Sequence, residues 1–299
     1  MVLSRLQVRF CALSMLIVLA LSSAALSLAL PTSGSDGEAL IERDIESRAV
    51  TYWQPKVGAK FNYLLLNPKT SLTTQDAGVD AFFVDLFDNT AANIKTIKAK
   101  GAHVVCYFSA GTYENWRSDK SKFKSSDLGN NLDDWPGERW LKVNSTNVRS
   151  IMKSRLDLAK SKGCDGVDPD NVDGFDNDNG LGLTKSGSIN YVNFLAAEAH
   201  SRGLAIGLKN AVSIASKVLS GMQWSVNEQC HQYNECSAYQ VFIKAGKPVF
   251  EVEYPKGDEV SNNKAVSKAV HDGICNNSAA KNFSTIIKNI NLDTWTDFC

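Results

Sequence analysis

The segment 163–174 (GCDGVDPDNVDG) brings acidic residues close enough together to do chemistry. It begins like a buried strand, and since side chains alternate along a strand, Asp168 and Asp170 fall on the same face. Two neighbouring carboxyl groups disturb each other's pKa values without helping a core to fold, so the pair predicts a functional site. A calcium-like acidic loop or a solvated turn is the alternative interpretation, because Asp, Asn and Gly are common turn residues.

Further polar side chains follow apolar, strand-like runs elsewhere in the chain. They are Asp85, Asp88, Tyr107, Ser109, Lys209, Asn210, Asn227, Glu228, Glu251 and Glu253. All of these except Ser109 and Glu228 are expected to bind substrate, together with Asp168. No Ser-His-Asp combination and no zinc-type Cys/His spacing accompanies them, so no metal site is expected. Converging carboxylates suit glycoside hydrolysis, which needs one acid to protonate the leaving oxygen and one carboxylate as nucleophile or base. Aromatic residues of the same regions could stack on sugar rings: Tyr107, Tyr113, Trp116, Tyr233 and Tyr254.

Ion pairing is the structural alternative for most of the acidic residues. Lys209 is the candidate partner of Asp85, Asp168, Glu251 and Glu253, although Asp85 could instead cap the helix that starts after it. Lys288 is a second candidate for the two glutamates, which could instead bind a cationic substrate. Asp173 is expected to cap a loop. Glu228 has few charged neighbours in the sequence, which favours a functional role.

The elements that must position these residues read as an alternation of strands and helices. Strands are expected at 61–66, 81–85, 103–108, 163–170, 203–208, 224–226, 248–254 and 283–287. Helices are expected at 91–100, 147–162, 188–202, 214–219 and 236–245. Eight buried strands alternating with helices predict an α/β fold, the (β/α)8 TIM barrel, whose chemistry lies at the carboxyl ends of the strands. An open doubly wound sheet is the alternative, although no Gly-x-Gly-x-x-Gly follows any run.

The N-terminus has the pattern of a secretory signal. Arg5 and Arg9 precede the apolar run 10–21 and the small residues of 22–27. We therefore expect a signal peptide at 1–27, a linker or pro-segment at 28–50 and one barrel domain at 51–299. An uncleaved anchor is the alternative. The expected product is secreted and extracellular, without membrane contact after cleavage.

The charge and the cysteines agree with a secreted protein. Lys+Arg and Asp+Glu are both 32, and no basic stripe is present, which argues against a nucleic-acid partner. Six of the seven cysteines lie outside the signal, and an even number suits disulfides. Spacing predicts the pairs Cys230–Cys236 and Cys275–Cys299, while Cys106 and Cys164 are a third pair or two buried thiols. Sequons allow N-glycosylation at Asn144, Asn276 and Asn282. A monomer is the default expectation.

Several motifs together resemble those of glycoside hydrolase family 114, the endo-α-1,4-polygalactosaminidases. Besides 163–174, they are Trp53-x-Pro55-x-x-Gly58, Asp85-Leu86-Phe87-Asp88, 106–111 (CYFSAG) with Glu114 and Arg117, 135–141 (WPGERWL) and 227–230 (NEQC). The family often has a Trp/Gln-rich first strand, and the run 61–66 departs from it. The resemblance implies a secreted TIM-barrel hydrolase without a metal or other cofactor. Its substrate would be a polysaccharide of galactosamine and N-acetylgalactosamine, cut inside the chain at α-1,4 linkages.

The resemblance also implies roles for individual residues. The family's fold is similar to that of the α-galactosidase clan, with an Asp nucleophile after strand four and a carboxylate acid/base on strand six. These positions correspond to Asp170 and Glu228, with Asp168 one layer below; Asp168 as nucleophile is the alternative. A retaining mechanism is expected, and inversion stays open. The competing functions are a non-catalytic sugar-binding protein on the same barrel and an α-galactosidase-like exo-enzyme.

Overall fold

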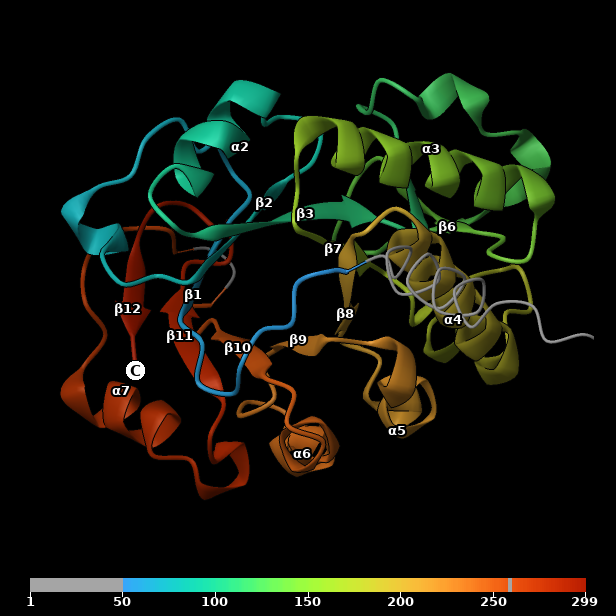
Figure 1. Ribbon diagram of the computed structural model, residues 1–299. Coiled ribbons are helices and arrows are strands. Elements are labelled where there is room, and N and C mark those ends of the chain that lie inside the picture. Colours follow the sequence, from blue (N-terminus) through green and yellow to red (C-terminus); the bar gives the residue numbers. More distant parts are fainter. Residues whose placement is uncertain (1–50, 258–259) are drawn as a thin grey trace, which may run out of the picture. The chain divides into compact units, whose positions relative to one another are not determined.

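Eight parallel strands surround the centre of the molecule (Figure 1). They are β1 (Phe61–Leu64), β2 (Ala81–Asp85), β3 (His103–Ser109), β7 (Gly166–Asp170), β8 (Ala205–Lys209), β9 (Trp224–Glu228), β10 (Val249–Glu253) and β11 (Ser284–Lys288). This computed structural model describes residues 51–257 and 260–299. The predicted signal and linker at 1–50 lie outside the described residues. Each predicted strand is present in the predicted order, which confirms the (β/α)8 barrel and excludes the open sheet.

The barrel is closed by the C-terminal end of the chain. Strand β12 (Thr296–Phe298) pairs antiparallel with β11 and was not predicted. The Thr296 hydroxyl donates to Asn62 Oδ1 of β1 at 3.0 Å, and the Leu65 N–H donates to the Leu292 carbonyl at 3.1 Å. These contacts join the first strand to the last segment, so the C-terminus completes the wall between β11 and β1.

Helices cover the outside of the strands. They are α2 (Ala91–Lys98), α3 (Thr146–Lys162), α4 (Lys185–Ser201), α5 (Ala215–Val218), α6 (Cys236–Lys244) and α7 (Lys268–Cys275). Ser145 caps the start of α3, because its hydroxyl accepts from the Asn147 N–H, and Gly163, with φ of 88°, caps its end. The five predicted helices are confirmed, while α7, only eight residues long and interrupted by Gly273, was missed. Among the described helices, none has the length and apolar character to cross a membrane.

The long connection after β3 holds a second, three-stranded sheet, which the sequence did not predict. Its strands are β4 (Thr112–Glu114), β5 (Leu128–Asn131) and β6 (Glu138–Leu141), in the order β4-β6-β5. Gly111 starts this excursion against the backbone of Asn171, and a β-carbon at position 111 would collide with the Asn171 carbonyl oxygen. The small sheet is thereby held beside the end of β7.

Aromatic rings fill the inside of the barrel below the mouth. Phe250 packs on Phe61 and Phe83 with ring centroids 4.8 and 5.3 Å apart, and Trp224 lies 6.1 Å from Phe83. A β-carbon on Gly207 would collide with the Trp224 indole, so this glycine makes room for it. A second apolar layer lies between the strands and the helices. The side chains at the mouth therefore stand on a rigid floor.

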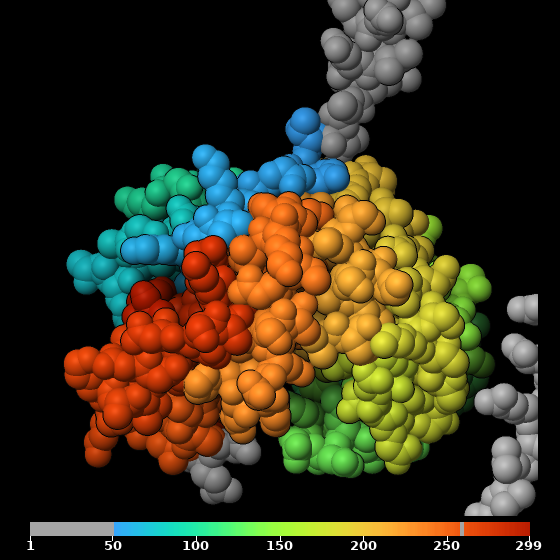
Figure 2. All heavy atoms as spheres, turned by 90° about the horizontal axis from the view of Figure 1, so that it is seen from below, coloured from blue at the N-terminus to red at the C-terminus, as the bar shows by residue number. Residues whose placement is uncertain are grey.

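The N-terminal segment packs against the opposite end of the barrel from the strands' carboxyl ends. Trp53 stacks on His103, the first residue of β3, at 4.4 Å and lies 5.5 Å from Trp224. Tyr52 stacks on His200 of α4 at 4.1 Å. Figure 2 shows this blue segment beside the orange and yellow parts of the chain. Tyr52 and Trp53 thus cover the base of the barrel.

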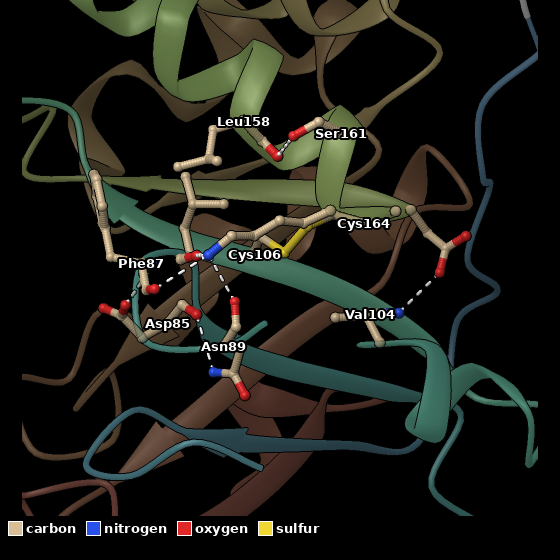
Figure 3. The surroundings of a disulfide bond; sticks show 12 residues. Asp85, Phe87, Asn89, Val104, Cys106, Leu158, Ser161 and Cys164 are labelled. Carbon is tan, nitrogen blue, oxygen red and sulfur yellow. Dashed lines mark hydrogen bonds between the residues drawn. A yellow bond between two sulfur atoms is a disulfide. The ribbon is translucent and has the colours of Figure 1, made fainter. Parts of the chain in front are cut away.

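Three disulfides join described segments. Cys230–Cys236 and Cys275–Cys299 confirm the predicted pairs, and Cys106–Cys164 settles the open alternative in favour of a third disulfide. The Cys106–Cys164 bond ties β3 to the residue that leads into β7 (Figure 3). Beside it, Lys162 Nζ donates to the carbonyls of Leu86, Phe87 and Asn89. This cluster holds the loop after β2 against the end of α3.

The disulfides should differ in their effect on stability. Cys106–Cys164 closes a sequence separation of 58 and Cys230–Cys236 one of only 6. The loop-entropy relation predicts that Cys106→Ala/Cys164→Ala lowers the free energy of unfolding by about 4 kcal/mol and Cys230→Ala/Cys236→Ala by about 2 kcal/mol. Urea denaturation of both double variants measures the difference. Equal losses would show that chain entropy is not the main contribution.

Candidate functional site

Three adjacent strands end at the mouth in charged residues that meet in space. Asp170 ends β7, Lys209 ends β8 and Glu228 ends β9. Lys209 Nζ lies 3.1 Å from Asp170 Oδ2 and 2.9 Å from Glu228 Oε2, and its side chain is only 2% exposed. Burial opposes the charged form of Lys209, but the surrounding carboxylates outweigh it and raise the pKa above the ordinary value. One buried ammonium therefore bridges two carboxylates.

The backbone turns sharply just after each of these charged residues. Asn171, Asn210 and Gln229 have φ values of 60°, 47° and 63°, in the left-handed region that side chains other than glycine rarely adopt. The Asn171 N–H donates to Asp170 Oδ1 at 2.7 Å. Asn210 Oδ1 accepts the Glu228 N–H at 2.9 Å. Strained residues of this kind persist where the surroundings hold them, and here they direct the chain away while orienting the carboxylates.

Asp170 accepts three hydrogen bonds and is partly open to solvent. Its donors are the Asn171 N–H, Lys209 and the Tyr107 hydroxyl, which lies 3.0 Å from Asp170 Oδ2. The Asp170 side chain is 14% exposed. A carboxyl group that is oriented by donors and still reachable from solvent is the arrangement required of a nucleophile or a base.

Glu228 is held by a comparable set of donors. The Tyr254 hydroxyl donates to Oε1 at 2.5 Å, while Lys209 and the Asn210 amide approach Oε2 at 2.9 and 3.1 Å. Burial alone would raise the pKa of Glu228. The Lys209 charge and the three hydrogen bonds outweigh burial and lower the pKa below the ordinary value of 4.5.

Asp168 lies beneath this pair and has a different electrostatic environment. It is fully buried, accepts from the Tyr63 hydroxyl at 2.7 Å, and its Oδ1 has no partner among the described side chains. Burial, opposed by Lys209 and helped by Asp170, raises the pKa of Asp168 to about 7. The expected Asp168–Lys209 ion pair is absent from the described contacts. Asp168 instead lies below Asp170 and Glu228 as a carboxyl group that is only about half ionised at pH 7.

Asp85 and Asp88 contact Arg117 instead of Lys209. Arg117 binds Asp85 through two hydrogen bonds of 3.1 and 2.7 Å, and Asp85 also accepts from the Phe87 N–H. Asp85 is buried, whereas Asp88 is 56% exposed and lies 4.0 Å from Arg117. The expected Asp85–Lys209 pair is thus wrong, because the guanidinium from the loop after β4 occupies both Asp85 oxygens.

Glu251, Glu253 and Asn227 occupy buried positions on β9 and β10. Glu251 accepts from the Thr285 hydroxyl at 2.5 Å, and Glu253 accepts from the His231 N–H at 2.7 Å. The candidate ion pairs of both glutamates with Lys209 or Lys288 do not form, so this prediction is wrong. Lys288 instead donates to the Asp293 carbonyl and to Thr296. Asn227 is buried and accepts from the Cys230 N–H at 3.1 Å, so it orients the loop after β9.

The expected loop position of Asp173 is confirmed, but no cap bond forms. Asp173 precedes a short 3-10 helix, Gly174–Asp176, without a hydrogen bond from its side chain to that helix. Burial and the charge of Asp170 raise the pKa of Asp173 to about 6. Three hydroxyls of the site were missed as partners of the carboxylates, those of Tyr63, Tyr107 and Tyr254. A tyrosine inside or just after an apolar strand was the available signal, because a buried hydroxyl needs a partner.

An open cleft of about 600 Å³ borders the site on the side of β3 and β7. Its walls are the loop 130–135, Trp140 and residues after β7. Four aspartates line it: Asp133, Asp134, Asp173 and Asp178. No lysine or arginine lines it, and Trp135, 55% exposed, supplies a large aromatic surface. The cleft suits a polar ligand that carries positive charge and a face for stacking.

Two described side-chain clusters have the composition of metal ligands. One joins His271, Cys275 and Cys299, and the other joins Cys230, Cys236 and Glu251. All four cysteines are disulfide-bonded, so neither cluster offers a thiolate.

A carboxylate pair at the mouth of a barrel occurs in many enzymes, so the pair alone does not identify the family. The family model of glycoside-hydrolase family GH114 matches residues 43–299. The chain belongs to family GH114. The resemblance seen in the sequence is thereby confirmed, and the family assigns the protein as a glycoside hydrolase.

Solved structures agree with this GH114 assignment. The crystal structure of Aspergillus fumigatus Ega3 in complex with galactosamine is 55% identical, with a TM-score of 0.80 over 83% of this chain and 98% of that chain. The glycoside hydrolase domain of PelA from Pseudomonas aeruginosa is 10% identical, with a TM-score of 0.61 over 80% of this chain and 98% of that chain, and shows the fold alone. No curated protein matches.

Replacing Asp168 tests its electrostatic environment. Its pKa is about 7 in the folded protein against an ordinary 3.8, so Asp168 contributes stability below pH 4 that is lost as the pH rises through 7. Asp168→Asn lacks this loss. Relative to wild type, the variant should gain about 4 kcal/mol of unfolding free energy between these pH values. Urea denaturation across the pH range measures it, and parallel curves would contradict the raised pKa.

Proposed function

We propose that this GH114 enzyme cleaves α-1,4 linkages inside polysaccharides of galactosamine and N-acetylgalactosamine. The observation that carries the proposal is the pair Asp170 and Glu228 bridged by Lys209 beside an acidic cleft. Galactosamine is a cation at neutral pH, and the four aspartates of the cleft attract a cation. The likeness to Ega3, whose structure contains galactosamine, supports the same sugar class.

In the proposed mechanism Asp170 is the nucleophile and Glu228 the acid/base. The Asp170 carboxylate forms a bond to the anomeric carbon while the glycosidic C–O bond breaks, and Glu228 gives its proton to the departing oxygen. Glu228 then takes a proton from water, which attacks the anomeric carbon and releases Asp170. Asp168 forms no ion pair with Lys209, is fully buried and is only about half ionised at pH 7, which makes it the weaker candidate for nucleophile.

The distances favour retention of configuration. Because Asp170 Oδ2 and Glu228 Oε2 contact the same nitrogen at 3.1 and 2.9 Å, these oxygens lie within about 6 Å of each other. Retaining enzymes hold their carboxyl groups roughly 5–5.5 Å apart, and inverting enzymes roughly 6.5–9.5 Å apart to admit a water molecule. The contacts of Lys209 with both carboxylates therefore support a retaining mechanism.

We further propose secretion through the segment 1–27, action outside the cell as a monomer, and N-glycosylation. The sequon residues Asn144, Asn276 and Asn282 are exposed, which supports access for a glycan.

Substitution of the two carboxylates tests the function. Wild-type protein should convert an α-1,4-galactosamine polymer into short oligomers, whereas Asp170→Asn and Glu228→Gln should each lose at least about 10³-fold in kcat. Product lengths by mass spectrometry separate internal cleavage from release of single sugars, which an exo-enzyme would give. Asp157→Asn, at a position 66% exposed on α3, is the matched control. Activity surviving in Asp170→Asn would assign the nucleophile to Asp168.

The pH dependence tests the role of Glu228. A general acid must be protonated, and the donors on Glu228 lower its pKa, so kcat/KM should fall as the pH rises above that low pKa. Tyr254→Phe removes one donor, raises the pKa of Glu228 and should move this falling limb to higher pH. A kcat/KM profile of both proteins measures the shift. A limb that moves to lower pH, or stays in place, would contradict the role of Glu228 as acid.

A further inference from the structure

Two of the motifs found in the sequence meet beside Asp170. Segment 106–111 carries Ser109 at the end of β3, and segment 135–141 carries Glu138 at the start of β6. The proposed chemistry uses neither of these side chains. Hydrogen bonds nevertheless connect both of them to the residue that directly follows Asp170.

A hydrogen-bond chain of four side chains makes this connection. The amide nitrogen of Asn171, Nδ2, donates to Ser109 Oγ at 3.0 Å and lies 3.3 Å from Thr112 Oγ1. The hydroxyls of Ser109 and Thr112 are hydrogen-bonded to each other. The Thr112 hydroxyl also contacts Glu138 Oε2 at 2.6 Å. Ser109, Thr112 and Glu138 are buried, so their polar groups have to satisfy one another.

Glu138 fixes the direction of this hydrogen-bond chain. An ionised carboxylate only accepts, and a proton on Oε1 would still leave Oε2 an acceptor, so the Thr112 hydroxyl donates its single proton to Glu138. Thr112 Oγ1 is then the acceptor for the Ser109 hydroxyl. Ser109 Oγ already accepts the Thr112 N–H at 3.1 Å and has no second proton to give. Asn171 must therefore turn its NH2 group toward the two hydroxyls.

The other end of the Asn171 amide is left for a ligand. Asn171 lines the acidic cleft, and its Oδ1 has no hydrogen-bond partner among residues 51–257 and 260–299. The backbone of this residue is also fixed. Its N–H donates to Asp170 Oδ1 at 2.7 Å, and Gly111 packs against its carbonyl group. The side-chain carbonyl oxygen is thus a preset acceptor next to the nucleophile.

Glu138 is retained although its place is unfavourable for a charge. It lies directly opposite Glu114 in the β4–β6 pair, and like charges placed opposite each other destabilise a sheet. Arg117 and Arg155 approach Glu114 at 2.8 and 3.7 Å, whereas Glu138 forms no ion pair in the described part of the protein. A buried acid without a charged partner favours a functional role.

We propose that Glu138 and Asn171 together select a cationic sugar at the nucleophile. Acting through the two hydroxyls, Glu138 holds the Asn171 carbonyl oxygen where it accepts from the ammonium group of a galactosamine beside Asp170. The negative end of the amide dipole attracts this cation, whereas a turned amide would present its NH2 group and repel it. This inference rests on the proposed function and names the residues that select the deacetylated sugar.

Thr112→Val tests the hydrogen-bond chain without changing any charge. It leaves the Ser109 hydroxyl with Asn171 Oδ1 as its acceptor in this cluster, so the amide should turn. In an inactive Glu228→Gln background, titration calorimetry with α-1,4-linked galactosamine oligomers should then give a Kd about tenfold higher, as expected for the loss of one hydrogen bond to a charged group. The Kd of N-acetylated oligomers should not rise.

Two further variants, made in the same background, separate the hydrogen-bond chain from simple charge effects. Thr112→Ser keeps the hydroxyl and should bind both kinds of oligomer like its parent. Glu138→Leu removes the terminal acceptor and should raise the Kd of galactosamine oligomers at least as much as Thr112→Val does. Asp157→Asn also removes one negative charge, at a position 66% exposed on α3, and is the matched control that should leave both Kd values unchanged.

Neutron diffraction observes the amide directly and needs no substitution. In the deuterated wild-type protein, two deuterons should lie on the side-chain atom of Asn171 that faces Ser109 and Thr112. Deuterons on the atom that faces the cleft, or a Thr112→Val variant that binds both oligomers like its parent, would overturn this inference and leave the hydrolase intact. Failure of the wild-type protein to cut galactosamine polymers of any acetylation would overturn the proposed function instead.

Discussion

The buried ammonium of Lys209 is the constraint on which the rest of the mouth depends. A lysine that is 2% exposed must be compensated by opposite charge, and two carboxylates that face each other must be separated by positive charge. Lys209 satisfies both needs at once, with contacts of 3.1 and 2.9 Å to Asp170 and Glu228. Because one nitrogen spans both acids, their separation is limited by its two bonds. The separation of Asp170 and Glu228 is therefore limited by the residue that ends β8.

Groups that have little freedom to move hold Asp170, Lys209 and Glu228 in place. Tyrosine hydroxyls orient the carboxylates from below and from the side, and left-handed residues turn the chain away just after each charged position. The Cys106–Cys164 bond ties β3 to the approach of β7, and so fixes Tyr107 relative to Asp170. Asp168 shows what this arrangement costs in stability, because a buried carboxyl with a pKa of about 7 destabilises the folded protein once it ionises.

The mouth is also asymmetric across the triad. Aspartates and Trp135 form the wall of the cleft on the Asp170 side, whereas the loop that follows Glu228 is closed by the Cys230–Cys236 disulfide. The same carboxyl type behaves differently in the two places. Burial raises the pKa of Asp173 in the cleft to about 6 and that of Glu253 on β10 to about 8. Charge at the mouth is thus decided by burial as much as by residue type.

The sequence by itself predicted the barrel and the two carboxylates, Asp170 and Glu228, that meet at its mouth. Parallel strands buried on both faces must be apolar runs, so eight such runs, each followed by polar residues, indicate both the fold and the edge where Asp170 and Glu228 meet. It also indicated the Cys230–Cys236 disulfide, because two cysteines with a sequence separation of 6 can close a small loop.

Only the tertiary structure decided which partner each charge takes. The sequence offered four candidate partners for Lys209, namely Asp85, Asp168, Glu251 and Glu253. In the folded protein Lys209 pairs with Asp170 and Glu228, and Asp85 pairs with Arg117. The sheet β4-β6-β5 and the helix α7 were missed because short elements carry weak periodicity and depend on contacts with distant segments. Strands β5 and β6 line the acidic cleft, so that cleft follows from long-range packing that local sequence does not encode.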